Sequence, residues 1–192
     1  FILPVLMRST TYDRLTGFCS ISSLVALAQG LENLWRKQGH MRLVLGLHDI
    51  PRELLLARNR QSEDGLISQL ESRLLNEASS LNDEFQRDAV ISVAWMMKAG
   101  LLQVKIAEPS GTGDKYIFHP KRLIFRDSHG HVVTAVGSSN ETVAGMQGNY
   151  EELTVHKSWD GDLKHVQAHV LNFEKIWTGE DRDLRIHEFS TD

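Results

Sequence analysis

The chain of 192 residues is 41% hydrophobic and 24% charged, with a formal net charge of −4, and these are ordinary values for a globular protein. They exclude a collagen-like repeat, a disordered acidic tail and a membrane-embedded bundle, and no apolar run approaches the ~20 residues of a membrane span. The single cysteine, Cys19, cannot form an internal disulfide, so we expect a reducing, cytoplasmic setting. We expect residues 1–192 to form one domain, as a fragment of a longer chain.

Helical and strand patterns alternate through the first half of the chain. Apolar residues at 3.6-residue spacing predict a helix over residues 21–35, with Gly39 as its stop. The short run at 41–47 predicts a buried strand, because it is too short and too β-branched at its centre for a helix. Two further helical stripes are predicted over residues 66–78 and from about 83 to 97.

Strand patterns dominate the second half of the chain. We expect strands over residues 101–107, 116–125, 131–137 and 150–156, a hairpin turn at 127–130, and a helix over about 162–177. Helices interleaved with strands, followed by paired strands, predict an α/β domain in which helices flank a mixed β-sheet.

The charge is unevenly distributed along the sequence. Segments 36–60 and 98–126 each hold six Lys or Arg against two Asp or Glu, whereas residues 151–192 hold five against ten. The overall charge argues against non-specific binding of polyanions, but the two basic segments could form a local phosphate-binding face. A solvated surface of mixed charge is the alternative interpretation.

Four kinds of polar group come from neighbouring strand segments between residues 116 and 156. His119 and Lys121 lie two residues apart, so in an extended strand they share a face. Gly137-Ser138-Ser139-Asn140 follows a predicted strand, and Glu151 begins the next one. These groups could therefore converge at one edge of the sheet.

This combination of side chains suits cleavage of a phosphodiester. An imidazole can attack phosphorus and form a covalent phosphohistidine, which divides one difficult displacement into two easier ones. An ammonium and an amide can hold the non-bridging oxygens and stabilise the transition state. A carboxylate bonded to the far ring nitrogen fixes the tautomer of the imidazole. None of these steps requires a metal.

The order His119-x-Lys121, then GSSN at 137–140, then Glu151 resembles the signature of the phospholipase D superfamily, in particular its nuclease branch. Residues 11–46 are similar to the opening of phospholipase D-like domains that precede superfamily 2 helicases. The resemblance implies a single phospholipase D-like domain. It also implies catalytic roles for His119, Lys121, Asn140 and Glu151 and substrate contacts from Ser138 and Arg122.

Two carboxylates near this signature need separate treatment. Asp127 lies eight residues after His119, about one position later than the family spacing, and is left out of the site. Glu151 fits the usual interval from Asn140 better than Glu152 does, but both stay open as the site carboxylate, since neighbours in a strand face opposite sides.

By this resemblance the chain is a metal-independent phosphodiesterase, an endonuclease that hydrolyses nucleic acid, with DNA as the expected substrate. No cofactor is expected. The resemblance implies a restriction or repair protein fused to a helicase domain, and a homodimer that shares one active site. No membrane partner is expected. The alternative is a non-catalytic DNA-binding or targeting module that keeps the phosphate pocket.

The remaining histidines are expected to be structural or surface residues. His129 and His131 flank a glycine turn without an accompanying cysteine cluster. His165 and His169 share one helical face, but the Glu of an H-E-x-x-H motif is missing. No metal site is therefore predicted.

Overall fold

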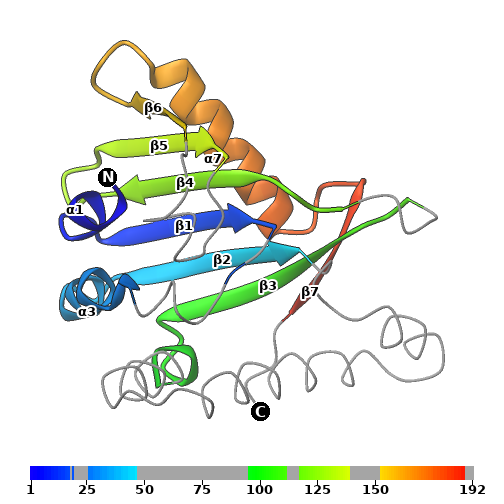
Figure 1. The fold of residues 1–192 in the computed structure, drawn as a ribbon, viewed down its shortest axis with the longest axis horizontal. Helices are drawn as coiled ribbons and strands as arrows, with labels where there is room; N and C mark the ends of the chain where they lie inside the picture. Colours follow the sequence, from blue (N-terminus) through cyan, green and yellow to red (C-terminus); the bar gives the residue numbers. More distant parts are fainter. Residues whose placement is uncertain (18, 20–25, 47–94, 112–116, 139–151, 189–192) are drawn as a thin grey trace.

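The structure is a computed structural model that describes residues 1–17, 19, 26–46, 95–111, 117–138 and 152–188. Within these residues one seven-stranded sheet runs in the order β6-β5-β4-β1-β2-β3-β7 (Figure 1). The strands are β1 (Thr11–Thr16), β2 (His40–Gly46), β3 (Leu102–Pro109), β4 (Lys121–Arg126), β5 (Val132–Gly137), β6 (Leu153–Lys157) and β7 (Leu184–Glu188). β1, β2 and β3 are parallel, and every other neighbouring pair is antiparallel. This mixed sheet confirms the predicted fold class.

Helices cover both faces of the sheet. Side chains alternate between the two faces along each strand, so each face has apolar side chains that pack against helices. The helices are α1 (Ile2–Leu6), α3 (Ala28–Arg36) and α7 (Leu163–Trp177). On one face, Tyr12 and Leu123 pack with residues of α1 and α3. On the other face, Leu15 and Ile124 pack with Phe173 of α7. Within the described residues no helix is both long and apolar enough to cross a membrane.

A buried cluster of charged side chains fastens α7 to the centre of the sheet. Asp13 of β1 is fully buried and accepts two hydrogen bonds from Arg42 of β2, at 2.7 and 2.8 Å, and one from Arg126 of β4. Glu174 of α7 accepts two more from Arg42, at 3.0 and 2.6 Å. Burial alone would lower the pKa of Arg42, but these hydrogen bonds and charges outweigh burial and raise it. The four residues therefore act as one charged network.

The predicted elements agree with the described residues in most of the chain. The strands predicted at 41–47, 101–107 and 131–137 and the helix at 162–177 are confirmed within a few residues. Of the helix predicted over 21–35, α3 confirms the second half. The stripe at 66–78 lies outside the described residues, and of the one at 83–97 only residues 95–97 are described and helical.

Two strand predictions differ in extent from the structure, and three elements were not expected from periodicity. The run at 116–125 forms a strand only from Lys121, because the described residues before it, including Pro120, are irregular. In the run predicted at 150–156 the strand begins at Leu153, and residues 150 and 151 lie outside the described residues. The helix α1 and the strands β1 and β7 carry no clear periodic pattern in sequence.

Candidate active site

Three segments that the sequence analysis singled out meet at one end of the sheet. In the antiparallel ladder, Thr16 at the end of β1 pairs with Lys121 at the start of β4. Gly137 at the end of β5 pairs with Leu153 at the start of β6. Because β5 runs antiparallel to β4 and to β6, its end lies beside the starts of both, and His119 lies two residues before the first residue of β4.

His119 and Lys121 are in direct contact at this end of the sheet. The Nζ atom of Lys121 lies 2.9 Å from Nδ1 and 2.7 Å from Nε2 of the His119 ring, and 3.4 Å from the carbonyl oxygen of His119. Lys121 is buried, whereas His119 is exposed. The neighbouring Phe118 is buried in the core and anchors this segment to it. The exposed His119 imidazole is accessible to a substrate, as a nucleophile must be. The Lys121 ammonium is fixed beside it, as a cation that binds an oxyanion must be.

The Gly137-Ser138 segment is bonded to the start of β6. The backbone N–H of Ser138 donates to the carbonyl oxygen of Glu152 at 3.2 Å, and the N–H of Glu152 donates to Ser138 Oγ at 3.3 Å. A Cβ at Gly137 would clash with the Glu152 carbonyl oxygen and lie 2.8 Å from Leu153 Cδ2. Glycine is therefore the residue that allows β5 and β6 to approach here.

Two of the predicted catalytic residues, Asn140 and Glu151, lie outside the described residues. Ser138 is described, and its hydroxyl group accepts the Glu152 bond above. Arg122 is described as well, but its side chain is on the opposite face of the sheet from Lys121, where its guanidinium donates to Asn172 of α7. Burial lowers the pKa of Arg122. The structure thus brings His119, Lys121 and Ser138 to one end of the sheet and does not place the Arg122 side chain with them.

Two buried polar residues of β1 border Lys121 and were not singled out from the sequence. Arg14 and Thr16 are both fully buried. Thr16 pairs directly with Lys121, and Arg14 is the diagonal neighbour of Lys121 on the same face. The available signal is the pattern TYDRLT. It includes the cation Arg14, and in the structure both faces of this strand are buried.

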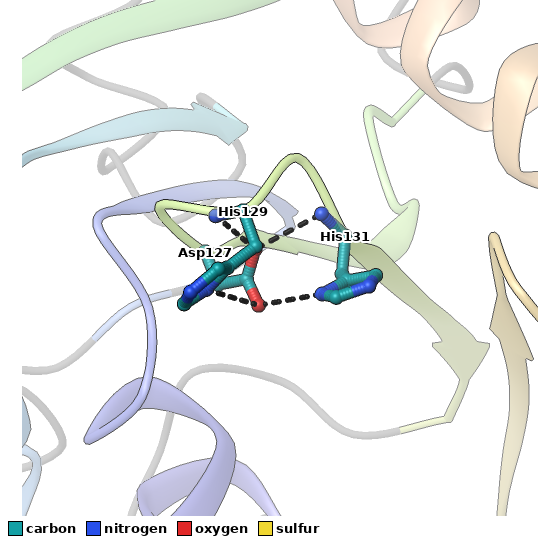
Figure 2. A group of neighbouring side chains, drawn as sticks. All are labelled: Asp127, His129 and His131. Carbon is teal, nitrogen blue, oxygen red and sulfur yellow. Dashed lines mark hydrogen bonds and ion pairs between the residues drawn. The ribbon is translucent and has the colours of Figure 1, made fainter.

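Asp127 belongs to the opposite end of β4 and has a structural role (Figure 2). Its Oδ1 accepts the backbone N–H groups of His129 and His131 at 2.8 and 2.9 Å, and its Oδ2 lies 2.9 Å from His131 Nδ1. Burial alone would raise the pKa of Asp127, but these bonds outweigh burial and lower it. Asp127 follows the last residue of the six-residue strand that begins at Lys121, so the two residues are roughly 20 Å apart at ~3.3 Å per residue. Leaving Asp127 out of the site therefore agrees with its position.

The α7 histidines lie on the face that packs against β5 and β6. His169 is half-buried, with Nδ1 2.8 Å from Thr134 Oγ1, while His165 is exposed. Burial, together with the charges of Arg122, His156 and His165, lowers the pKa of His169 to about 4, so this ring is neutral at pH 7.

The sheet and its flanking helices form an α/β fold consistent with a phospholipase D-like domain. Among solved structures the chain is similar to NucT from Helicobacter pylori, with a TM-score of 0.52 and 11% sequence identity. The match covers 92% of this chain and 84% of that one. Comparison with protein-family models and with curated proteins gives no match. At this identity the similarity shows the fold alone.

Proposed function

We propose that this chain is a metal-independent phosphodiesterase that cleaves nucleic acid, with DNA as its substrate, through a covalent phosphohistidine at His119. The observation that carries the proposal is the contact of the His119 ring with Lys121 Nζ, at 2.7–2.9 Å, at the end of the sheet where the Gly137-Ser138 segment also lies. The fold shared with NucT supports a nuclease of the phospholipase D type.

In this mechanism the neutral His119 ring attacks phosphorus, a P–N bond forms, and the P–O bond to the leaving oxygen breaks. Water then attacks phosphorus and releases the imidazole. Lys121 and Asn140 hold the non-bridging oxygens, and Ser138 is the further substrate contact, whereas Arg122, which donates to Asn172 on the opposite face, is not assigned one. Glu151 accepts a hydrogen bond from the ring nitrogen that does not react.

The register of β6 supports Glu151 over Glu152 as the site carboxylate. Leu153 packs on the face that carries α1 and α3, which Lys121 shares through its alternation with Leu123. The neighbour Glu152 therefore points toward the α7 face, away from Lys121.

The reaction also needs an acid in line with the leaving oxygen, on the side opposite the nucleophile. The sequence contains one H-x-K and one GSxN. A homodimer related by a two-fold axis supplies the second His119 across a shared site, with the 137–140 turn in the interface. Light scattering should then show a dimer, and a fully active monomer would contradict the shared site.

The biological setting is part of the same proposal. The similarity of residues 11–46 to the opening of helicase-linked domains supports fusion to a helicase and work in restriction or repair. A cytoplasmic location is part of this proposal, and the single cysteine supports it.

The test is a nuclease assay on linear and supercoiled DNA in the presence of EDTA. Wild-type protein should cleave, His119→Ala should not, and His129→Ala, an exposed histidine at the other end of the sheet, should match wild type. Lys121→Ala should lower turnover ~10²–10³-fold, as expected for losing one charge-stabilising group. Trapped enzyme should carry one DNA end joined to His119 through an acid-labile P–N bond.

Two other results would contradict the mechanism. Cleavage that EDTA abolishes and Mg²⁺ restores would indicate a metal-dependent nuclease. DNA binding without cleavage, unchanged in His119→Ala, would indicate the binding or targeting module instead.

A further inference from the structure

Three histidines and one aspartate gather where the edge strand β6 meets α7. His156 lies on β6, Asp162 directly precedes α7, and His165 and His169 are one helical turn apart on α7. His156 Nδ1 is 3.3 Å from Asp162 Oδ2, and His165 Nδ1 is 3.9 Å from Asp162 Oδ1. His156, Asp162 and His165 each offer one ligand atom, and these three atoms lie within 4.8 Å of one another.

These separations are close to those of ligands around a tetrahedral ion. Bonds of ~2.0–2.1 Å to imidazole nitrogen and carboxylate oxygen place two ligand atoms of a tetrahedron ~3.4 Å apart. The 3.3 Å pair already has this spacing, and the 3.9 Å pair reaches it by a small rotation of the His165 side chain, which is 66% exposed.

One of the candidate ligand atoms lacks a hydrogen bond. His156 Nδ1 is buried and has no hydrogen-bond partner among the described residues, although the Asp162 carboxylate is near. A buried polar atom without a partner costs free energy, and a bound cation would provide that partner. The His165 ring stacks on the His156 ring, with centroids 4.8 Å apart and planes 15° apart, so binding one ion through both rings requires the exposed His165 ring to turn out of the stack.

We propose that His156, Asp162 and His165 bind one Zn²⁺ ion. Two imidazoles and one carboxylate are a donor set that zinc accepts, with the fourth position left for water or for His169. The His169 ring is 5.4 Å from the His156 ring, and the contact of its Nδ1 with Thr134 Oγ1 leaves Nε2 as its metal-binding atom.

The ion would fasten the edge strand to the helix that covers it. β6 has a sheet neighbour only on its β5 side among the described strands. His156 is three residues along β6 from Leu153, about 10 Å at ~3.3 Å per residue, so the ion would lie away from the phosphodiesterase site. Its role would be structural, and the proposal does not depend on the nuclease function.

The group of Asp127, His129 and His131 has a similar spacing and provides a control. Both carboxylate oxygens of Asp127 are already used, by two backbone N–H groups and by the His131 ring (Figure 2). The turn itself accounts for that group, so it is not expected to bind zinc.

The experiment uses protein without a histidine tag, dialysed against a chelator and titrated calorimetrically with Zn²⁺ alone. Wild type should bind one equivalent, and His156→Ala and His165→Ala should each lower the affinity by about 100-fold or more. His129→Ala and His119→Ala should bind as wild type does. Co²⁺ in place of Zn²⁺ should give the visible absorption of a tetrahedral complex, and Zn²⁺ should raise the Tm of wild type but not of His165→Ala.

His165→Ala removes an exposed side chain, so its circular dichroism should match wild type and its loss of binding is interpretable even where His156→Ala does not fold. Less than one equivalent bound, full affinity in His165→Ala, or equal loss in His129→Ala would overturn the proposal.

Discussion

The close approach of β5 and β6 at Gly137 makes Gly137→Ala a direct test of how the site is positioned. A Cβ at this residue would fall about 1.5 Å short of the 3.4 Å that ordinary contacts keep from the Glu152 carbonyl oxygen. The atom that must move is backbone, so no side-chain rotation relieves the clash. The start of β6 would have to withdraw by an ångström or more.

That withdrawal carries two costs. It breaks the bond from Ser138 N–H to Glu152 at 3.2 Å, worth about 1 kcal/mol, and adds overpacking strain of about 1–3 kcal/mol. We therefore expect the free energy of unfolding to fall by about 2–4 kcal/mol in urea titrations. Turnover should fall ~10²-fold, since a displacement of about 1 Å near reacting groups has that effect.

Gly130→Ala is the matched control. Gly130 has φ of +84° and nothing within 4 Å of its added Cβ, so the substitution introduces backbone strain without a clash. It should cost about 1 kcal/mol and leave turnover unchanged, because it lies at the opposite end of β4 and β5. If Gly137→Ala is as stable and as active as Gly130→Ala, the strand approach does not position the site.

The remaining predictions concern charged groups. Asp13→Ala should lower the free energy of unfolding by about 3–5 kcal/mol, because it leaves Arg42 and Arg126 without their buried partner; Asp160→Ala, in an exposed pair with Lys157, should cost less than 1 kcal/mol. Equal losses in the two variants would contradict this. Because the pKa of Asp127 is lowered, its negative charge stabilises the fold fully at pH values above the ordinary carboxyl pKa of 3.8. This stabilisation is lost as the pH falls through the pKa of Asp127 in the folded protein. The stability gap between wild type and Asp127→Asn should therefore shrink in unfolding titrations from pH 5 to pH 3, and a constant gap would contradict it.

Much of the sheet could be predicted from sequence because its strands are buried apolar runs bounded by turn residues. The turn at 127–130 was predictable because Asp127 and Gly130 supply the carboxylate cap and the positive φ that a tight connection needs. The start of β4 was misjudged because the irregular segment through Pro120 keeps an apolar, strand-like composition. β1 was missed by periodicity because its buried ion pairs place charged residues in a central strand.

The local chemistry of the site was predictable in part. The spacing of His119 and Lys121 predicted that the two side chains lie together, and the structure shows the Lys121 ammonium in contact with the His119 ring. The pattern TYDRLT marks Arg14 as an unusual cation, but the relation of Arg14 and Thr16 to Lys121 exists only through the pairing of β1 with β4. The grouping of His156 with His165 likewise depends on how α7 crosses the sheet edge (Figure 1).

Several cations of the two basic segments have partners within the fold. Arg42 and Arg126 are bound to Asp13, and Lys105 lies 2.6 Å from Glu188 and over the Trp177 ring. These cations are engaged in holding the sheet to α7 and β7, so reversing one of them should act on stability before it acts on DNA affinity. On the proposed function, charge that selects a phosphate would come from groups near His119, where Lys121 is the described example. A steep dependence of DNA binding on salt that persists in an Arg126→Ala protein would agree with this division of roles, and a slope flattened by about one unit would contradict it.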